Sequence, residues 1–140
     1  MNADLKKAKK IFSDTGATCV LCKGRSRCES DLRGVAPLLD LLDTGMDFSG
    51  YSAADKVVGK ATAFLYCLLG VTAVYTPVIS QAALQVLTQH GIATEYDLCV
   101  PAIFNHRKDG FCPMETATRD ISDPKQALCA IRSTLEKLHS

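Results

Sequence analysis

The sequence lacks the features that mark several large protein classes. It contains no tryptophan, and aromatic residues make up only 6% of its 140 positions. Its 16 basic and 15 acidic side chains nearly cancel, so no strong field of one sign attracts nucleic acid or a membrane surface. No apolar run approaches the roughly 20 residues that cross a bilayer, and the first residues do not resemble a secretion signal. We therefore expect a protein that binds neither membranes nor nucleic acid.

What is present is typical of one soluble domain covering residues 1–140. Hydrophobic residues account for 47% of the chain and charged residues for 22%, which are ordinary values for a globular protein. The seven cysteines are odd in number and scattered. Because a chain of this size can build a core without disulfide bonds, we interpret them as reduced thiols and expect a cytoplasmic location.

Residues 52–70 form the stretch around which the chain is organised. The pattern predicts a buried strand that turns directly into a helix with Asp55 as N-cap and Gly70 as the stop. Apolar residues on every side indicate a central helix; they are Val57, Val58, Ala61, Phe64, Leu65, Leu68 and Leu69.

Two lysines lie near the start of this predicted helix, at Lys56 and Lys60. A helix N-terminus is partly positive and disfavours cations, so we expect a bound anion to compensate them. Two alternatives stay open. The long side chains could reach solvent from a buried helix, or one lysine could form a Schiff base with a carbonyl substrate.

Local patterns predict the other elements. Helices are expected at 4–13, 34–43 and 80–90 and after the capping box that begins at Asp123, a hairpin at 17–30, and strands at 48–54, 71–75 (ended by Pro77) and 92–100. The last three strands are joined by helices, which makes them parallel. We therefore predict an α/β protein with a mixed sheet, an antiparallel N-terminal hairpin, three parallel strands and helices on both faces.

Cys19 and Cys22 have the spacing of a redox or zinc half-site. In a strand, however, alternation directs side chains three positions apart to opposite faces, and Cys28 has no second cysteine near it to complete a ligand pair. This arrangement disfavours metal or redox use.

The segment 101–115 carries more functional side chains than a connection needs. Its polar turn holds Asn105, His106, Arg107 and Asp109, and it lies where ligands bind in such sheets, beyond the carboxyl ends of the parallel strands. Cys112 then precedes a helix start. It is either an ordinary cap or a thiol whose pKa the helix N-terminus lowers, although nearby Glu115 opposes a strongly acidic thiol.

Several of these stretches resemble the family called domain of unknown function 1893. They are ADKVVGKA at 54–61, LLGV at 68–71, Asn105 with Arg107, and DGFCPME at 109–115. The similarity extends from about Cys19 to the C-terminal helix. It implies a cytidine-deaminase-like fold, a three-layer α/β/α sandwich, and assembly as a homo-dimer or larger homo-oligomer. It implies no established activity.

The zinc motifs of working deaminases are H-x-E or C-x-E followed by P-C-x-x-C. At the expected positions this chain has Ala53 to Val57, without His or Cys, and Pro77 to Gln81, with the proline but neither cysteine. With no protein ligand left, we expect no zinc, no other cofactor and no zinc-dependent deamination.

We expect the remaining pocket to bind a small anionic molecule such as a nucleotide. Lysines and arginine would pair with the anion, Asn105 would orient it, and carboxylates would hold the lysines or a sugar hydroxyl. The expected binding residues are Asp55, Lys56, Lys60, Asn105, Arg107, Asp109 and Glu115. Two alternatives remain: an enzyme with Cys112 as nucleophile, assisted by Lys56 or His106, and a non-catalytic oligomeric scaffold.

Overall fold

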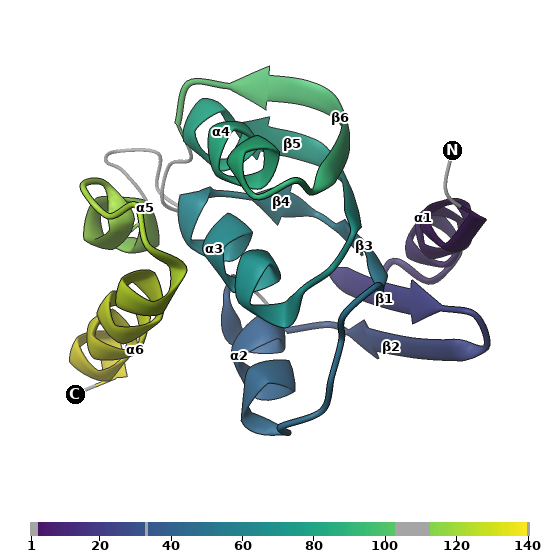
Figure 1. Cartoon of the computed structure of the whole chain (residues 1–140), viewed down its shortest axis with the longest axis horizontal. Helices are drawn as coiled ribbons and strands as arrows, with labels where there is room; N and C mark the ends of the chain where they lie inside the picture. Colours follow the sequence, from purple (N-terminus) through teal and green to yellow (C-terminus); the bar gives the residue numbers. More distant parts are fainter. Residues whose placement is uncertain (1–2, 33, 103–112, 140) are drawn as a thin grey trace.

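The computed structural model describes residues 3–32, 34–102 and 113–139. Within these residues the helices are α1 (Ala3–Thr15), α2 (Ala36–Asp43), α3 (Lys60–Leu69), α4 (Gln81–Gln89), α5 (Pro113–Thr118) and α6 (Pro124–His139). The strands are β1 (Cys19–Lys23), β2 (Ser26–Ser30), β3 (Ser52–Asp55), β4 (Val57–Val58), β5 (Ala73–Ser80) and β6 (Ala93–Val100) (Figure 1).

The six strands of the described chain form one mixed sheet. β2, β1 and β3 are antiparallel neighbours, and β3 pairs parallel with β5. β4 continues along the same side of β5, and β6 pairs parallel with its other side. The predicted α/β class, the N-terminal hairpin and the three parallel strand positions are therefore confirmed.

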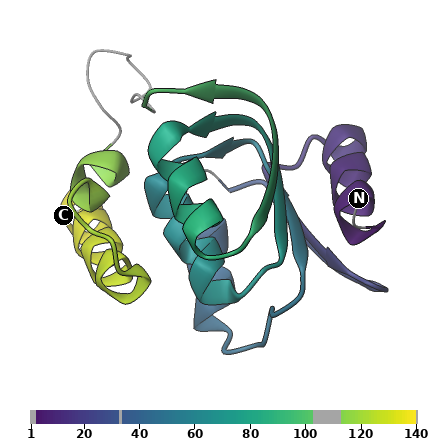
Figure 2. The same cartoon turned by 45° about the horizontal axis from the view of Figure 1, so that its top comes forward.

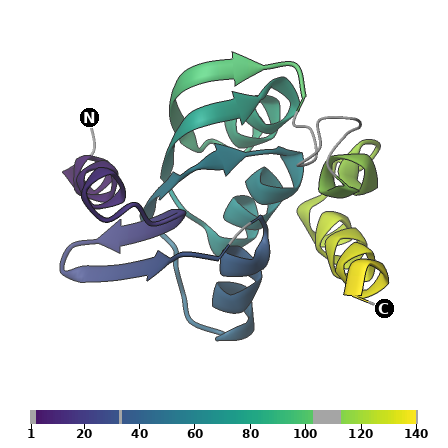
Figure 3. The same cartoon turned by 180° about the vertical axis from the view of Figure 1, so that it is seen from behind.

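The sheet lies between helical layers of unequal size. α1 packs on one face through Leu5, Ala8 and Ile11, while α2, α3 and α4 cover the other face. α5 and α6 lie on the far side of α3 from the sheet, so α1 and α6 lie at opposite ends of the molecule (Figures 2 and 3). None of the described helices is long and apolar enough to span a bilayer.

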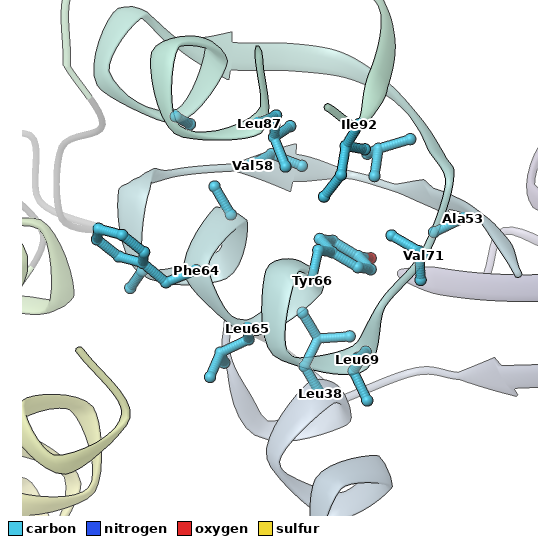
Figure 4. Close-up of a cluster of buried hydrophobic side chains, with 14 of the residues drawn as sticks. Leu38, Ala53, Val58, Phe64, Leu65, Tyr66, Leu69, Val71, Leu87 and Ile92 are labelled. Carbon is cyan, nitrogen blue, oxygen red and sulfur yellow. The ribbon is translucent and has the colours of Figure 1, made fainter. Parts of the chain in front are cut away.

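The main core lies around α3, as its apolar sequence predicts. Phe64, Leu65 and Tyr66 are fully buried and pack with Leu38 of α2 and Leu87 of α4 (Figure 4).

The two cysteines of β1 point to opposite faces of the sheet. Cys19 belongs to this core, whereas Cys22 packs under α1 on the opposite face, as expected for their spacing.

The central helix begins four residues later than the sequence predicts. Asp55 ends β3, and the strand resumes at Val57 and Val58, which pair with β5. The backbone N–H of Lys56 donates to the carbonyl of Thr18 at 3.0 Å. The prediction of Asp55 as N-cap is therefore wrong, because sheet hydrogen bonds hold residues 55–58 extended. The extended residue Gly59 is the N-cap instead, and Gly70 ends the helix with φ +81°.

Pro77 does not end its strand as predicted. β5 runs through it to Ser80 in unchanged register with both neighbours. Proline has no N–H to give to a ladder, and the strand beside it is itself interrupted at Lys56, between β3 and β4. The gap between β3 and β4 therefore lies beside Pro77, where β5 has no backbone N–H to donate to a neighbouring strand.

The strand at 93–100 is less covered than its alternation predicts. β6 lies at the edge of the sheet, and its residues are exposed or half-buried. The helix starts at Ser80 and Asp123 are confirmed. Ser80 Oγ accepts from the N–H of Ala83 at 3.1 Å, and Asp123 Oδ2 accepts from the N–H of Gln126 at 3.0 Å.

Candidate functional site

Asp55 ends β3 within the sheet, directly opposite Cys19 of β1, while β5 continues beyond it to Ser80. Its carboxyl group is buried, with only 7% of the residue exposed. The hydroxyl of Tyr66, which α3 directs back towards the sheet, donates to Asp55 Oδ2 at 2.6 Å. The expected site residue thus lies inside the protein, bound to a tyrosine of the same chain.

Cys19 extends this pair into a buried network, with its Sγ atom 3.3 Å from the hydroxyl oxygen of Tyr66. Burial raises the pKa of Asp55 to about 7, although hydrogen bonds from Tyr66 and the backbone of Val57 and Lys56 oppose the shift. Burial, and then the nearby carboxylate, also raise the pKa of Cys19 and of Tyr66. Near neutral pH, Asp55 is therefore the member of this network that titrates.

The sequence does not identify Cys19 or Tyr66 as partners of Asp55. One signal for the tyrosine was present, because a Tyr in a helix that is apolar on every side needs an acceptor for its hydroxyl. The eleven-residue separation from Asp55 gives no local pattern that names that acceptor.

The N-terminus of α3 binds a carboxylate from its own chain. Gly59 offers no side-chain cap, and Glu115 Oε1 of α5 accepts the backbone N–H of Lys60 at 2.6 Å. Burial raises the pKa of Glu115, while the hydrogen bond from Lys60 and its positive charge lower it. The partly positive helix end is therefore compensated by residue 115, which was expected to hold the lysines.

The two lysines occupy different surroundings. Lys60 Nζ donates to the carbonyl of Arg119 at 2.8 Å and lies 5.7 Å from the centroid of the Phe64 ring. Lys56 is exposed, at the interruption between β3 and β4. Only Lys60 thus lies at the helix N-terminus that the sequence assigned to both.

Lys60 lines a groove of about 170 Å³ between α3, α4 and the segment that joins α5 to α6. Its lining residues are Lys60, Phe64, Ala82, Gln85, Val86, Gln89, Ile121 and Ser122. The groove therefore combines one cation and three uncharged polar side chains with an apolar remainder.

A second cavity, of about 150 Å³, lies between the β1–β2 hairpin and α2. Cys19 and Cys28 line it together with Glu29 and Asp40. Its charged groups are acidic, so an anion is not the ligand that it favours.

Five residues singled out in the sequence fall in the segment 103–112, outside the described residues: Asn105, His106, Arg107, Asp109 and Cys112. Among residues 3–32, 34–102 and 113–139, no three His, Cys, Asp or Glu side chains are grouped so that they could hold a metal ion. The segments 53–57 and 77–81 lie in β3, β4, β5 and the start of α4.

Fold and site together define a class: an α/β protein with a mixed sheet, a buried Cys–Tyr–Asp network and a lysine-lined groove beside its central helix. The model of the family "Domain of unknown function (DUF1893)" matches residues 7–135, and the chain belongs to this family. The resemblance noted in the sequence is thereby confirmed.

A crystal structure of a DUF1893 family protein (TM1506) from Thermotoga maritima is similar to this chain. The two share 27% sequence identity over 95% of this chain and 91% of the other, with a TM-score of 0.87. No curated protein matches the chain.

Proposed function

We propose that the protein binds a small anionic molecule in the groove beside Lys60, on a zinc-free, cytidine-deaminase-like frame. The observation that carries the proposal is the position of the Lys60 ammonium group in a groove that otherwise lacks charge. The mixed sheet, with its antiparallel hairpin followed by parallel strands, supports the deaminase-like part.

The groove has the composition of a ligand site on a small scale. Ligand pockets combine a mainly apolar lining with a few polar groups that fix orientation. Here Phe64 and Val86 are buried, whereas Gln85, Gln89 and Ser122 are exposed amides and a hydroxyl at the surface. These groups can donate to an anion that the ammonium attracts.

Lys60 retains the donors that such a ligand needs. An ammonium group has three N–H donors, and the described contacts engage one of them, with the carbonyl of Arg119. The helix N-terminus does not contribute, because Glu115 already accepts its N–H. The side chain, rather than the helix end, therefore supplies the attraction.

The size of the groove restricts the ligand. Its 170 Å³ is well below the roughly 300 Å³ at which drug-sized pockets begin. A phosphate or carboxylate with a short body fits within it. A nucleotide would place its phosphate beside Lys60 and extend outside the groove.

The proposal includes a reducing, cytoplasmic location. All six cysteines of the described residues are free thiols, including Cys19 and Cys28 in the same cavity. Disulfides are rare in the cytosol, which accords with unpaired cysteines in this number.

The test is a thermal-shift and calorimetric titration with inorganic phosphate, citrate and a nucleoside monophosphate. We expect at least one of them to stabilise the protein, and Lys60→Gln to abolish the effect. Lys56→Gln is the matched control, because it removes the same charge outside the groove. No stabilisation by any of the three, or a loss that is equal in both variants, would contradict the assignment to Lys60.

A further inference from the structure

The edge of the sheet at β6 is long and has neither lysine nor proline to hinder strand pairing. β6 pairs with β5 and, within the described residues, with no other strand (Figure 1). Edge strands are commonly protected by lysine, proline or short length. β6 spans eight residues with neither residue type, and Tyr96 and Leu98 are 41% and 56% exposed. The opposite edge, β2, is shorter and carries the ion pair Arg27–Glu29.

An apolar row crosses the sheet and ends at this edge. Val57 of β4, Val78 of β5 and Leu98 of β6 are direct neighbours in the strand register. The residue after each of them, namely Val58, Ile79 and Cys99, packs into the main core. Because adjacent residues of a strand point to opposite faces, the row lies on the face away from the main core at this end of the sheet; the alternation of β5 shifts by one between Tyr75, which packs under α1, and Ile79, which packs in the main core.

α1 does not cover the row. Its buried residues pack with Val20, Cys22, Ala54, Ala73 and Tyr75 instead. Val57 consequently remains 40% exposed, and Val78 is half-buried. Adjacent exposed apolar side chains that reach an open strand edge are typical of a surface that another strand extends.

We propose that two copies of the chain pair their β6 strands antiparallel about a two-fold axis at Leu98, joining their sheets into one. This arrangement places Leu98 opposite its own copy and continues the row into the partner as Leu98, Val78 and Val57 in reverse order. A second copy fits because the row is apolar up to the axis on both sides.

The charges on β6 select this register. With Leu98 on the axis, Asp97 lies opposite Cys99 of the partner subunit, and Glu95 lies opposite Pro101 of the partner subunit. An axis at Asp97 would oppose two aspartates, and an axis at Tyr96 would oppose Glu95 to an aspartate. Like charges directly opposite each other destabilise a strand pair.

The two acidic side chains are also compensated within their own chain. Lys9 of α1 forms an ion pair with Glu95. The hydroxyl of Tyr75 donates to Asp97 Oδ2 at 2.6 Å. Both partners lie on the same chain, so they accompany β6 into the dimer and weaken repulsion between the two edges. None of these residues lines the groove of Lys60, and the pairing does not depend on ligand binding.

The first test is the mass of the full chain by light scattering from micromolar to millimolar concentration. We expect a dimer, and we expect Leu98→Lys to raise its dissociation constant by at least about tenfold, because two ammonium groups then meet at the axis. Met46→Lys is the matched control, since Met46 is 63% exposed but lies before β3, away from the row. A monomer at every concentration, or a dimer that Leu98→Lys leaves intact, overturns the proposal.

The second test reads the register directly and does not require a disruptive change. Leu98→Cys places two thiols opposite each other, so mild oxidation should yield a covalent dimer on a non-reducing gel. Thr94→Cys is the control and should remain uncrosslinked, because its partner position lies beyond the paired strands. A covalent dimer in the control alone, or in neither variant of a dimeric protein, overturns the register.

Discussion

Asp55 combines a position within the sheet, at the end of β3, with nearly complete burial. A carboxylate without solvent is costly, so its pKa rises from 3.8 to about 7. Tyr66 and Cys19 supply a polar chain around it, but they do not restore the hydration that it lost. The native state consequently holds a proton on this side chain that the unfolded chain would release in mildly acidic solution.

The sign of the pH effect follows from this difference. The native state binds the proton and the unfolded state does not between about pH 4 and 7, so stability is greatest at low pH and falls as the pH rises towards 7. The loss attributable to Asp55 is at most about 4 kcal/mol. We expect Asp55→Asn to remove it, which urea denaturation of both proteins at pH 5, 6, 7 and 8 would measure. Parallel stability curves for the two proteins would contradict the raised pKa.

Sequence alone could not predict the surroundings of this residue. An aspartate between a strand and an apolar helix has the local pattern of an N-cap, which led to the wrong helix start. The decisive contacts come from Thr18, Cys19 and Tyr66, and no sequence pattern specifies which segments a sheet brings together.

At the level of elements, prediction succeeded where the signal is local. Ser80 and Asp123 cap their helices as expected, and the hairpin turns at Gly24, where φ is +57°. Prediction failed where the arrangement of neighbouring strands determines the structure. Examples are the continuation of β5 through Pro77 and the exposure of the edge strand β6. The groove beside Lys60 could not be predicted either, since it requires α4 and the segment that joins α5 to α6 to meet α3.

The C-terminal ends of α3 and α4 provide a matched pair of substitutions. Gly70 and Gly91 both have positive φ, +81° and +73°, so alanine costs about 1 kcal/mol of stability at each. A Cβ atom at Gly70 would also lie 3.0 Å from Ser49 Oγ, whereas one at Gly91 meets no atom within 4 Å. We expect Gly70→Ala to lower the free energy of unfolding by about 1 kcal/mol more than Gly91→Ala.

Chemical denaturation of both variants measures this difference, with an unchanged m-value as the check that unfolding stays two-state. Equal losses would mean that Ser49 moves aside without cost and that only the backbone conformation matters.

At the scale of the whole molecule, the two C-terminal helices belong to the core rather than to an appendage. Ala127 and Ile131 of α6 are completely buried in the cluster that surrounds α3. Arg132, the next residue, forms an exposed ion pair with Asp43 of α2 at 2.8 Å. Ile131 is thus fully buried, whereas the side chain of the next residue on the same helix is exposed to solvent.

We expect Ile131→Ala to destabilise the entire protein by about 2–4 kcal/mol, because it leaves a cavity against α3. Arg132→Ala should cost less than about 1 kcal/mol, as exposed ion pairs contribute little. Thermal or chemical unfolding followed by circular dichroism would measure the loss of stability in both variants. Hydrogen exchange in α1, at the other end of the molecule, would show whether the loss reaches the whole protein. Protection in α1 that stays unchanged in Ile131→Ala would mean that α6 unfolds separately.

The hydrogen bond between Glu115 and the backbone of Lys60 joins residues that are 55 positions apart. A ribosome delivers the N-terminal part first, so the strands of the described residues, β1 to β6, emerge while the start of α3 still lacks its carboxylate and Ile131 is not yet made. α5 and α6, which emerge after these strands, therefore close the structure around α3. Until they do, the apolar side of α3 that they cover is open to chaperones and to other unfinished chains.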